Sequence, residues 1–402
     1  MARIDWPKLF LVGLAVGCLS LFGCEGPVGP KGDPGTQGSQ GPAGEKGDKG
    51  DPGEKGEPGD SIPSFVGNEP CKVCHATVSA DFEKTGHRFA LNKASDVEKG
   101  GKAFYPHGNE IGAPPNKVWS DFAYVIGGFG WRALFVTPQG FVHTGKTAQY
   151  ILPDLIWDAY EESLQPNTLK FGDCAKCHTT GYDPNAKSDQ PGLTGTWKFE
   201  GVQCESCHGP ASLHVKNPIQ AKLRVDRTSQ ACGTCHSRSP RGNIHAKAGL
   251  VNNYQQLNTM LAGKKSAMSC INCHDPHKST KANQTQAIIA RCESCHFRET
   301  EAWEKYKKDT SSGMSNLTCL SCHMPKFAVS AKGDGAKLLG DLRVHLFAIN
   351  TSTTAKQFSD DGKTVSPYLT LKTSCLNGAC HANQPSRDIN WAAKEAVKFH
   401  AK

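Results

Sequence analysis

The stretch Cys71-Lys-Val-Cys74-His75 decides the fold, because the same arrangement recurs along the chain. Two cysteines separated by two residues, with a histidine directly after the second, are the attachment signature of a c-type haem. The cysteine thiols bond to the porphyrin, and the histidine ligates its iron. Six further copies begin at Cys174, Cys204, Cys232, Cys270, Cys292 and Cys319. Seven copies of one motif predict a protein that binds several haems covalently.

A longer variant lies near the end of the chain, Cys375-Leu-Asn-Gly-Ala-Cys380-His381, with four residues between the cysteines. We interpret it as an eighth attachment site, so the predicted cofactor is eight haem c groups. The predicted attachment residues are Cys71, Cys74, Cys174, Cys177, Cys204, Cys207, Cys232, Cys235, Cys270, Cys273, Cys292, Cys295, Cys319, Cys322, Cys375 and Cys380. The predicted proximal iron ligands are His75, His178, His208, His236, His274, His296, His323 and His381.

Two other uses of paired cysteines fit the pattern less well. Structural zinc sites also use Cys-x-x-Cys pairs, but they give no reason for a histidine after every second cysteine. A disulfide framework is possible in an exported protein, yet it does not require histidine either. The repeated histidine therefore favours haem.

Residues 1–23 are typical of an export signal. Arg3 and Lys8 precede an uncharged apolar run that is too short to span a bilayer comfortably. The run ends in Leu21-Phe-Gly-Cys24, which resembles a bacterial lipoprotein cleavage site. We therefore expect a lipid on Cys24 and a membrane anchor, with an outer-membrane lipoprotein or cell-surface location. An ordinary secretory signal is the alternative, and a location facing the periplasm also stays open.

Residues 24–61 form a lipid-anchored stalk in this interpretation. Glycine occupies every third position from Gly26 to Gly59, in twelve uninterrupted triplets. This is the period of the collagen triple helix, in which only glycine fits at the axis. The alternative is a disordered, charged linker. A collagen-like triple helix predicts a homotrimer with a stalk of roughly 100 Å.

Residues 62–402 then form the octahaem cytochrome c domain. We expect a mainly α and irregular fold with a haem-filled core, because much of the interior must be porphyrin. Residues 122–136 are rich in β-branched and aromatic side chains, which predicts a small antiparallel β-unit near 118–150. Helices are expected at 77–93, 285–308 and 392–400.

Sixteen histidines are present, and eight of them belong to the attachment motifs. The other eight equal the number of irons, so bis-histidine ligation of every haem is numerically possible. These candidates for distal ligands are His87, His107, His143, His214, His245, His277, His345 and His400.

The chain resembles the multihaem c-type cytochromes related to the tetrahaem electron carrier of ammonia-oxidising bacteria, and the outer-surface cytochromes of metal-reducing bacteria. The resemblance rests on Thr85-Gly-His87, Tyr124-Val-Ile-Gly-Gly-Phe-Gly-Trp131, Cys204-Glu-Ser-Cys-His-Gly-Pro210, Cys273-His-Asp-Pro-His277 and Val344-His-Leu-Phe347. It implies that His87, His214, His277 and His345 are distal ligands, and it gives the other four candidates no such support. In Leu250-Val-Asn-Asn-Tyr-Gln-Gln, asparagines stand where that family often has paired histidines.

Iron with two histidine ligands has no open position, so such haems carry electrons and do not bind substrate. The chain is therefore expected to be an electron carrier and not an enzyme, working with other cytochromes or extracellular electron acceptors. One alternative is an octahaem oxidoreductase that acts on a small nitrogen or sulfur compound at a five-coordinate haem. Another is a subunit of an extracellular cytochrome filament, in which His400 ligates a haem iron of the neighbouring chain. No nucleic-acid partner is expected. The formal charge of +8 is no evidence for one, because haem propionates would neutralise the basic residues.

Overall fold

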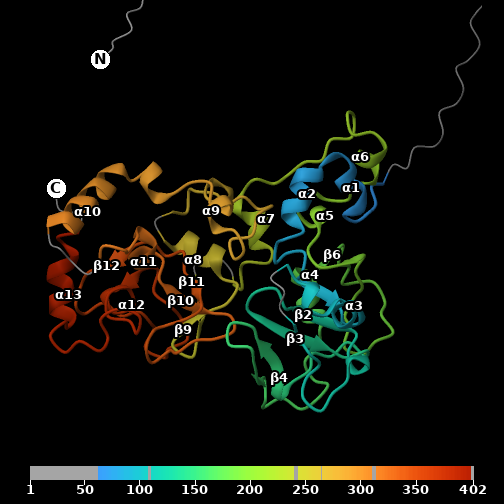
Figure 1. The fold of residues 1–402 in the computed structure, drawn as a ribbon, viewed down its shortest axis with the longest axis horizontal. Coiled ribbons are helices and arrows are strands. Elements are labelled where there is room, and N and C mark those ends of the chain that lie inside the picture. The colour runs from blue at the N-terminus through green and yellow to red at the C-terminus, as the bar shows by residue number, and fades with distance from the viewer. Residues whose placement is uncertain (1–61, 107–109, 240–242, 264, 310–313, 400–402) are drawn as a thin grey trace, which may run out of the picture. The chain divides into compact units, whose positions relative to one another are not determined.

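The structure is a computed structural model, and it describes residues 62–106, 110–239, 243–263, 265–309 and 314–399. The chain divides into two units, Met1–Glu57 and Pro58–Lys402. The predicted signal, Cys24, the predicted stalk, His107 and His400 lie outside the described residues. The following description concerns the second unit (Figure 1).

A five-stranded antiparallel sheet lies between the first two attachment motifs in the sequence. Its order is β1-β2-β3-β4-β5, so each strand pairs with the next one along the chain. The strands are β1 (Leu91–Lys93), β2 (Tyr124–Gly127), β3 (Arg132–Val136), β4 (Gly145–Ile151) and β5 (Ile156–Tyr160). An antiparallel unit near 118–150 is thus present, and β1 and β5 extend it on both sides.

Alternating side chains of this sheet pack into two hydrophobic cores. Val125 and Phe135 belong to one core, and Ile126 and Leu134 belong to the other. The alternation follows from the two-residue period of a strand. Gly128 supports the turn after β2, because its φ of 86° favours glycine and an added Cβ would lie 2.2 Å from the hydroxyl of Tyr105.

A second sheet joins parts of the chain that are distant in sequence. Its order is β11-β10-β9-β8, in which β9 and β10 run parallel. The strands are β8 (Ala246–Lys247), β9 (Leu250–Asn252), β10 (Lys326–Val329) and β11 (Leu342–Arg343). Two short pairs complete the strands of the described residues, namely β6 (Thr179–Thr180) with β7 (Phe199–Glu200) and β12 (Ile349–Asn350) with β13 (Leu369–Thr370).

The described residues therefore contain more strands than we expected from the sequence, which predicted a mainly helical and irregular fold.

Most helices of the described residues are short. They are α1 (Glu69–Cys74), α2 (Ala76–Phe82), α3 (Ala94–Gly100), α4 (Gly172–His178), α5 (Cys204–His208), α6 (Ser212–Lys216), α7 (Ser229–Gly233), α8 (Gln256–Ala262), α9 (Gln284–Ala287), α10 (Phe297–Asp309), α11 (Cys319–His323), α12 (Leu371–Ser374) and α13 (Ile389–Ala396). Single 3-10 turns are η1 (Gly101–Ala103), η2 (Trp119–Asp121), η3 (Cys270–Asn272) and η4 (Cys292–Ser294).

The expected helix over 77–93 is only partly right. The helix α2 ends at Phe82, and Leu91–Lys93 pairs with β2 as a strand. The prediction over 285–308 corresponds to α9 and α10. The helix α13 begins earlier than the expected residue 392, because the Asp388 side chain caps it by accepting a hydrogen bond from the Trp391 N–H across 2.8 Å.

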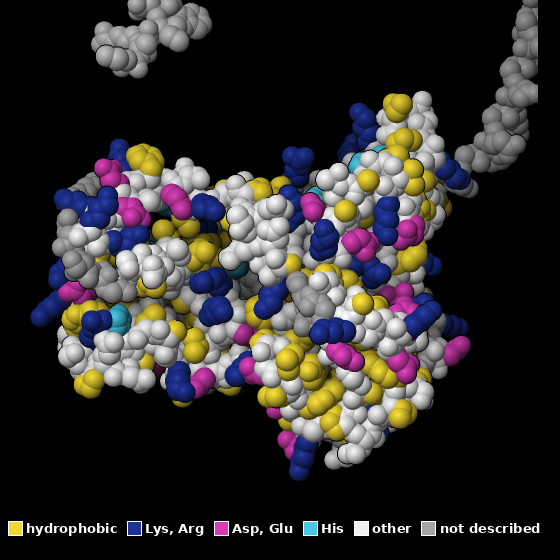
Figure 2. All heavy atoms as spheres, viewed as in Figure 1, with side chains coloured by type: hydrophobic (Ala, Val, Ile, Leu, Met, Phe, Trp, Pro, Cys, Tyr) yellow, Lys and Arg dark blue, Asp and Glu magenta, His cyan; other side chains and the backbone are white. Residues whose placement is uncertain are grey.

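Within the described ranges, none of the helices has the length and apolar character needed to cross a membrane. Basic, acidic and hydrophobic side chains are interspersed on the face shown in Figure 2. The positive charge is therefore not gathered into one patch on this face.

Candidate haem centres

Each of the seven Cys-x-x-Cys-His motifs folds as about one helical turn. The N–H of His75 donates to the carbonyl of Cys71 across 2.8 Å, and His296 bonds Cys292 in the same way across 2.9 Å. This turn brings the two cysteines and the histidine of a motif together. The eighth motif keeps the contact despite its longer loop, because the His381 N–H reaches the Cys375 carbonyl at 3.2 Å. The variant motif thus presents its three functional residues in a related way.

The sixteen described cysteines are all free of disulfide bonds. In the same described ranges, no group of three or more His, Cys, Asp or Glu residues is arranged to hold a metal ion by itself. The paired thiols are therefore available for attachment to a porphyrin.

Four motif histidines each face one histidine from outside the motifs. The ring centroids are 6.4 Å apart for His75 and His214, 6.1 Å for His87 and His236, and 6.2 Å both for His208 and His277 and for His274 and His345. Imidazole nitrogen binds a metal at about 2 Å, so two rings on opposite sides of one ion have centroids about 6 Å apart. The four pairs fit an iron between their rings.

Hydrogen bonds hold several of the candidate ligand rings, inside and outside these pairs, by one nitrogen. Nδ1 of His178 lies 2.9 Å from the Ala90 carbonyl oxygen, and Nδ1 of His214 lies 3.0 Å from that of Ala221. Such bonds fix the orientation of a metal-ligating imidazole and direct its other nitrogen to the metal. The site residues therefore fit a haem iron in orientation as well as in spacing.

Two of the facing histidines are deeply buried. Burial lowers the pKa of His87 and of His345 to about 4 in each case. A neutral ring is the form that ligates a metal.

Two other candidate ligands lie elsewhere. The ring of His143 packs against Phe122, with 5.5 Å between the ring centroids. The backbone of His245 bonds the Gln255 side chain, through its N–H at 2.8 Å and its carbonyl at 2.9 Å. In the part of the chain that the structure describes, neither ring stacks on a motif histidine.

The second attachment site has a tyrosine where the four sites described above have a facing histidine. The rings of His178 and Tyr254 are 6.4 Å apart and nearly perpendicular. The Arg238 guanidinium lies over the Tyr254 ring at 5.4 Å, and that of Arg132 lies over the Tyr160 ring at 5.1 Å. Burial raises the pKa of Tyr254, and the positive charges of both arginines oppose that rise.

Tyr254 is not among the site residues predicted from the sequence, although its segment departs from the resembling family. The signal was the pair of asparagines at 252 and 253, in a position where the resembling family often has histidine. Tyr254 has a φ of 56°, which is uncommon for a residue other than glycine. The chain therefore makes a sharp turn as it brings this ring towards His178.

Thiols of different motifs lie against each other. The Cys177 thiol lies 3.9 Å from the Thr234 carbonyl oxygen, inside the fourth motif, so the second and fourth sites are in contact. The neighbouring Cys235 thiol raises the pKa of Cys177. Thiol pairs of this kind are Cys71–Cys204, Cys177–Cys235, Cys232–Cys270 and Cys292–Cys319.

Electrostatic proximity links the remaining sites. Burial, and after it the Cys375 thiol, raises the pKa of Cys322 to about 12, so the seventh and eighth sites are neighbours. Cys207 with Cys235 and Cys273 with Cys295 are related in the same way. The first, third, fourth, fifth, sixth, seventh and eighth sites thus follow one another, with the second beside the fourth. Figure 1 shows α1 and α5 towards one end of this unit and α11 and α12 towards the other.

Two family models match the chain. The collagen triple helix repeat matches residues 21–64, and the cytochrome c554 and c-prime model matches residues 157–209. The chain is 25% identical over 140 residues to the multiheme cytochrome MtrA of Shewanella baltica, which covers 31% of this chain and 36% of that protein. It is 26% identical over 239 residues to the dissimilatory sulfite reductase MccA of Wolinella succinogenes, which covers 46% of this chain and 32% of that protein.

Solved structures give the same result for the fold. The outer cell wall cytochrome OcwA superposes with a TM-score of 0.54 at 16% identity, over 83% of this chain and 86% of that one. The octaheme sulfite reductase MccA of Wolinella succinogenes gives 0.56 at 14% identity, over 84% and 71%. This protein is a multihaem cytochrome with a collagen-like region. The resemblance inferred from the sequence is confirmed, and the cofactor is covalently bound haem c. This multihaem cytochrome spans about a third of the length of the two curated relatives it matches.

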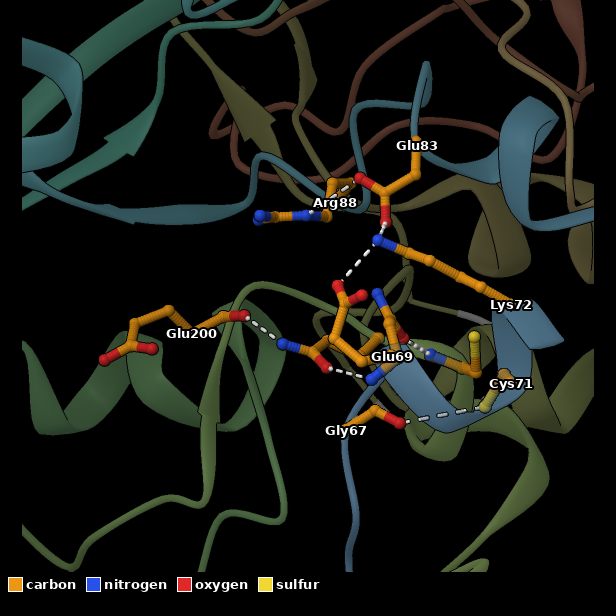
Figure 3. A network of polar contacts seen from close by, with 10 residues as sticks. Gly67, Glu69, Cys71, Lys72, Glu83, Arg88 and Glu200 are labelled. Carbon is orange, nitrogen blue, oxygen red and sulfur yellow. Dashed lines mark hydrogen bonds and ion pairs between the residues drawn. The ribbon is translucent and has the colours of Figure 1, made fainter. Parts of the chain in front are cut away.

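Polar contacts around the first site connect it to the third site of this cytochrome (Figure 3). Lys72 bridges Glu69 at 2.6 Å and Glu83 at 3.4 Å, and the Cys71 thiol approaches the Gly67 carbonyl at 3.7 Å. The Asn68 side chain accepts a hydrogen bond from the Cys204 N–H across 3.0 Å. The residues before one motif therefore position the first cysteine of another.

Proposed function

We propose that this multihaem cytochrome binds eight haem c groups and transfers electrons between them along one connected series. The observation that carries the proposal is the unbroken adjacency of the attachment sites from the first to the eighth. Bound haem supplies an iron that accepts and gives up one electron. The chain contributes thiols that place neighbouring groups close together, and histidines that saturate the irons of four sites.

The four histidine pairs support an assignment of distal ligands at four of the sites. His214 belongs to the first site, His277 to the third, His87 to the fourth and His345 to the fifth, by the ring distances described above. The pairing supports the ligand set implied by the family resemblance. Saturated irons at these sites favour electron transfer over substrate binding.

The proposed cellular role rests on the collagen-like region and on the fold shared with OcwA, an outer cell wall cytochrome. We propose export, lipid attachment at Cys24 and a trimeric stalk over 24–61, which would hold the haem domain 62–402 away from an outer membrane. Respiratory electrons would pass to other cytochromes or extracellular acceptors. The matching collagen repeat and the fold shared with an outer cell wall cytochrome support this proposal.

Removal of single haems tests the series. In the Cys270→Ala/Cys273→Ala variant the fifth site is lost, so the sites on either side are no longer adjacent. We expect haems on one side to be reduced quickly at an electrode and the rest at least tenfold more slowly. The matched control is Cys375→Ala/Cys380→Ala, which removes a terminal site and leaves the other seven connected. Equal, fast reduction in both variants would contradict the series.

A second function is favoured by the surroundings of the second site. Arg132 and Arg238 lie near His178 and Tyr254, and among the described carboxylates none is within ion-pair distance of either guanidinium. Their printed hydrogen-bond partners are neutral: Arg238 donates to the carbonyl and side-chain oxygens of Asn253 at 2.8 and 2.7 Å, and Arg132 donates to the Gln149 side chain at 3.2 Å. Guanidinium groups whose charge has no carboxylate partner attract anions. We infer that this site binds a small oxyanion at a haem that has no histidine on its distal side. Sulfite is one anion to test, because MccA is a sulfite reductase.

Spin state separates the two functions. A carrier with fully saturated irons is entirely low-spin when oxidised. An oxidoreductase shows a high-spin haem whose electron paramagnetic resonance signal changes when sulfite or nitrite is added. If the arginines only neutralise haem propionates, neither anion will alter the spectrum.

A further inference from the structure

The sixth attachment site presents its histidine to a lysine. Nζ of Lys265 lies 3.0 Å from Nε2 of His296, the motif histidine after Cys292 and Cys295. On the opposite side of the ring, Nδ1 of His296 lies 3.8 Å from a carboxylate oxygen of Glu299. A carboxylate on one nitrogen is the usual partner of a metal-ligating imidazole. The ligating nitrogen of His296 therefore points at the amine of Lys265.

The fold holds the backbone of this lysine in place. Lys265 follows α8, whose Thr259 hydroxyl accepts a hydrogen bond from the His345 N–H across 3.3 Å. The exit from α8 is fixed at Gly263, since an added Cβ there would lie 2.4 Å from the Leu346 carbonyl oxygen. After Lys265, its carbonyl accepts the N–H of Met268 across 3.0 Å. The amine is thus supplied by a loop anchored on both sides.

Lys265 also lies where two attachment sites meet. Burial raises the pKa of Cys273 and the thiol of Cys295 adds to the rise, while the positive charge of Lys265 opposes it. The lysine is therefore near the fifth site as well as the sixth. Across the described ranges, no carboxylate lies within ion-pair distance of its amine.

A lysine amine in this position can act as an iron ligand. The nitrogen of an unprotonated lysine amine carries a lone pair, which makes it a donor to a metal. The side chain has four methylene groups and can withdraw enough to admit an iron between the two nitrogens. Its half-buried position beside a histidine, and not beside an acid, is what such a role requires.

We propose that Lys265 is the distal ligand of the haem attached at Cys292 and Cys295, opposite His296. The inference rests on the proposed binding of haem at this motif, and it adds a histidine–lysine centre to the bis-histidine pairs. Since the sequence offers one spare histidine for each iron, a lysine here also means that at least one of those histidines is not an intramolecular ligand.

Three substitutions at Lys265 separate ligation from charge and from folding. Lys265→Ala removes the amine, Lys265→Arg keeps the charge but cannot ligate the iron, and Lys265→His supplies another nitrogen ligand. The matched control is Lys305→Ala, at an exposed position on α10. Intact mass gives the number of haems, and electron paramagnetic resonance of the oxidised protein gives the number of high-spin irons.

We expect Lys265→Ala and Lys265→Arg each to gain one high-spin haem per chain over the parent protein, with the haem count unchanged. Lys265→His should keep the parent spectrum, as should Lys305→Ala. If Lys265→Arg stays low-spin at full haem count, another residue ligates this iron and the proposal is wrong. A parent protein that lacks haem at Cys292 and Cys295 would instead overturn the haem assignment on which the inference rests.

Discussion

The backbone N–H of Gly67 donates a hydrogen bond to the carboxylate of Glu205 across 2.8 Å, although 138 residues separate them in the chain. Glu205 is 2% exposed and also accepts the N–H groups of Val66 at 3.0 Å and Ala211 at 2.8 Å. The glutamate lies inside the third attachment motif, while Gly67 precedes the first. One side chain therefore fixes two neighbouring haem sites to each other.

Replacing Glu205 by alanine should destabilise the cytochrome. Three backbone N–H groups would lose their acceptor, and an unsatisfied buried donor costs about 1–3 kcal/mol. We expect the free energy of unfolding, measured by denaturant titration of the holoprotein, to fall by at least that amount. The control Glu69→Gln alters an exposed ion pair, which contributes less than about 1 kcal/mol. Equal effects of the two substitutions would contradict the role of Glu205.

Loss of a distal histidine should open one iron. In the unsubstituted protein the ring centroids of His274 and His345 are 6.2 Å apart. The His345→Ala variant keeps His274 at the fifth site but loses the ring that faces it. We expect one haem per chain to become high-spin, seen by electron paramagnetic resonance at unchanged haem count. His143→Ala is the control, because His143 packs on Phe122 and not on a motif histidine. A high-spin signal in the control, or none in His345→Ala, would refute the assignment.

The sequence predicted the haem chemistry better than the surrounding fold. The attachment residues of a motif lie close together in the sequence, so Cys71, Cys74 and His75 can be recognised as a local pattern. Tyr254 and Lys265 are not, because each meets its motif histidine only through the tertiary fold. The β-unit could be predicted from aromatic and β-branched residues, whereas the parallel pairing of β9 with β10 joins segments about 75 residues apart and leaves no local pattern.

Anion binding at the second site should depend on Arg238. Hydrogen bonds with charged groups contribute about 1.5–3 kcal/mol, so Arg238→Ala should weaken binding of sulfite or nitrite about 10- to 150-fold. Optical titration of the oxidised protein gives the dissociation constants. Arg298→Ala, at an exposed arginine near the sixth motif, should leave them unchanged. If the parent protein binds neither anion, the site is not an oxyanion site and the carrier function stands alone.

Deletion of residues 26–61 should separate assembly from electron transfer. The truncated protein loses all twelve glycine triplets, so it should sediment as a monomer where the full chain sediments as a trimer. Its reduction of a soluble acceptor should be unchanged, because the haem domain is intact, while reduction of a solid acceptor should fall. A monomeric full-length chain without triple-helix dichroism would refute the stalk. Equal loss of both activities would refute its role as a spacer.

The eighth site has a longer loop between its two cysteines than the other seven sites. Its loop has two more residues than the others, yet His381 still bonds the Cys375 carbonyl at 3.2 Å, and the buried Asn377 side chain braces the loop by donating to the Thr373 carbonyl across 2.7 Å. The geometry therefore supports covalent attachment at both cysteines. Intact mass should show eight haems in the parent protein and seven in Cys375→Ala/Cys380→Ala. A parent mass with only seven haems would mean that the longer loop is not used, and the series would then end at the seventh site.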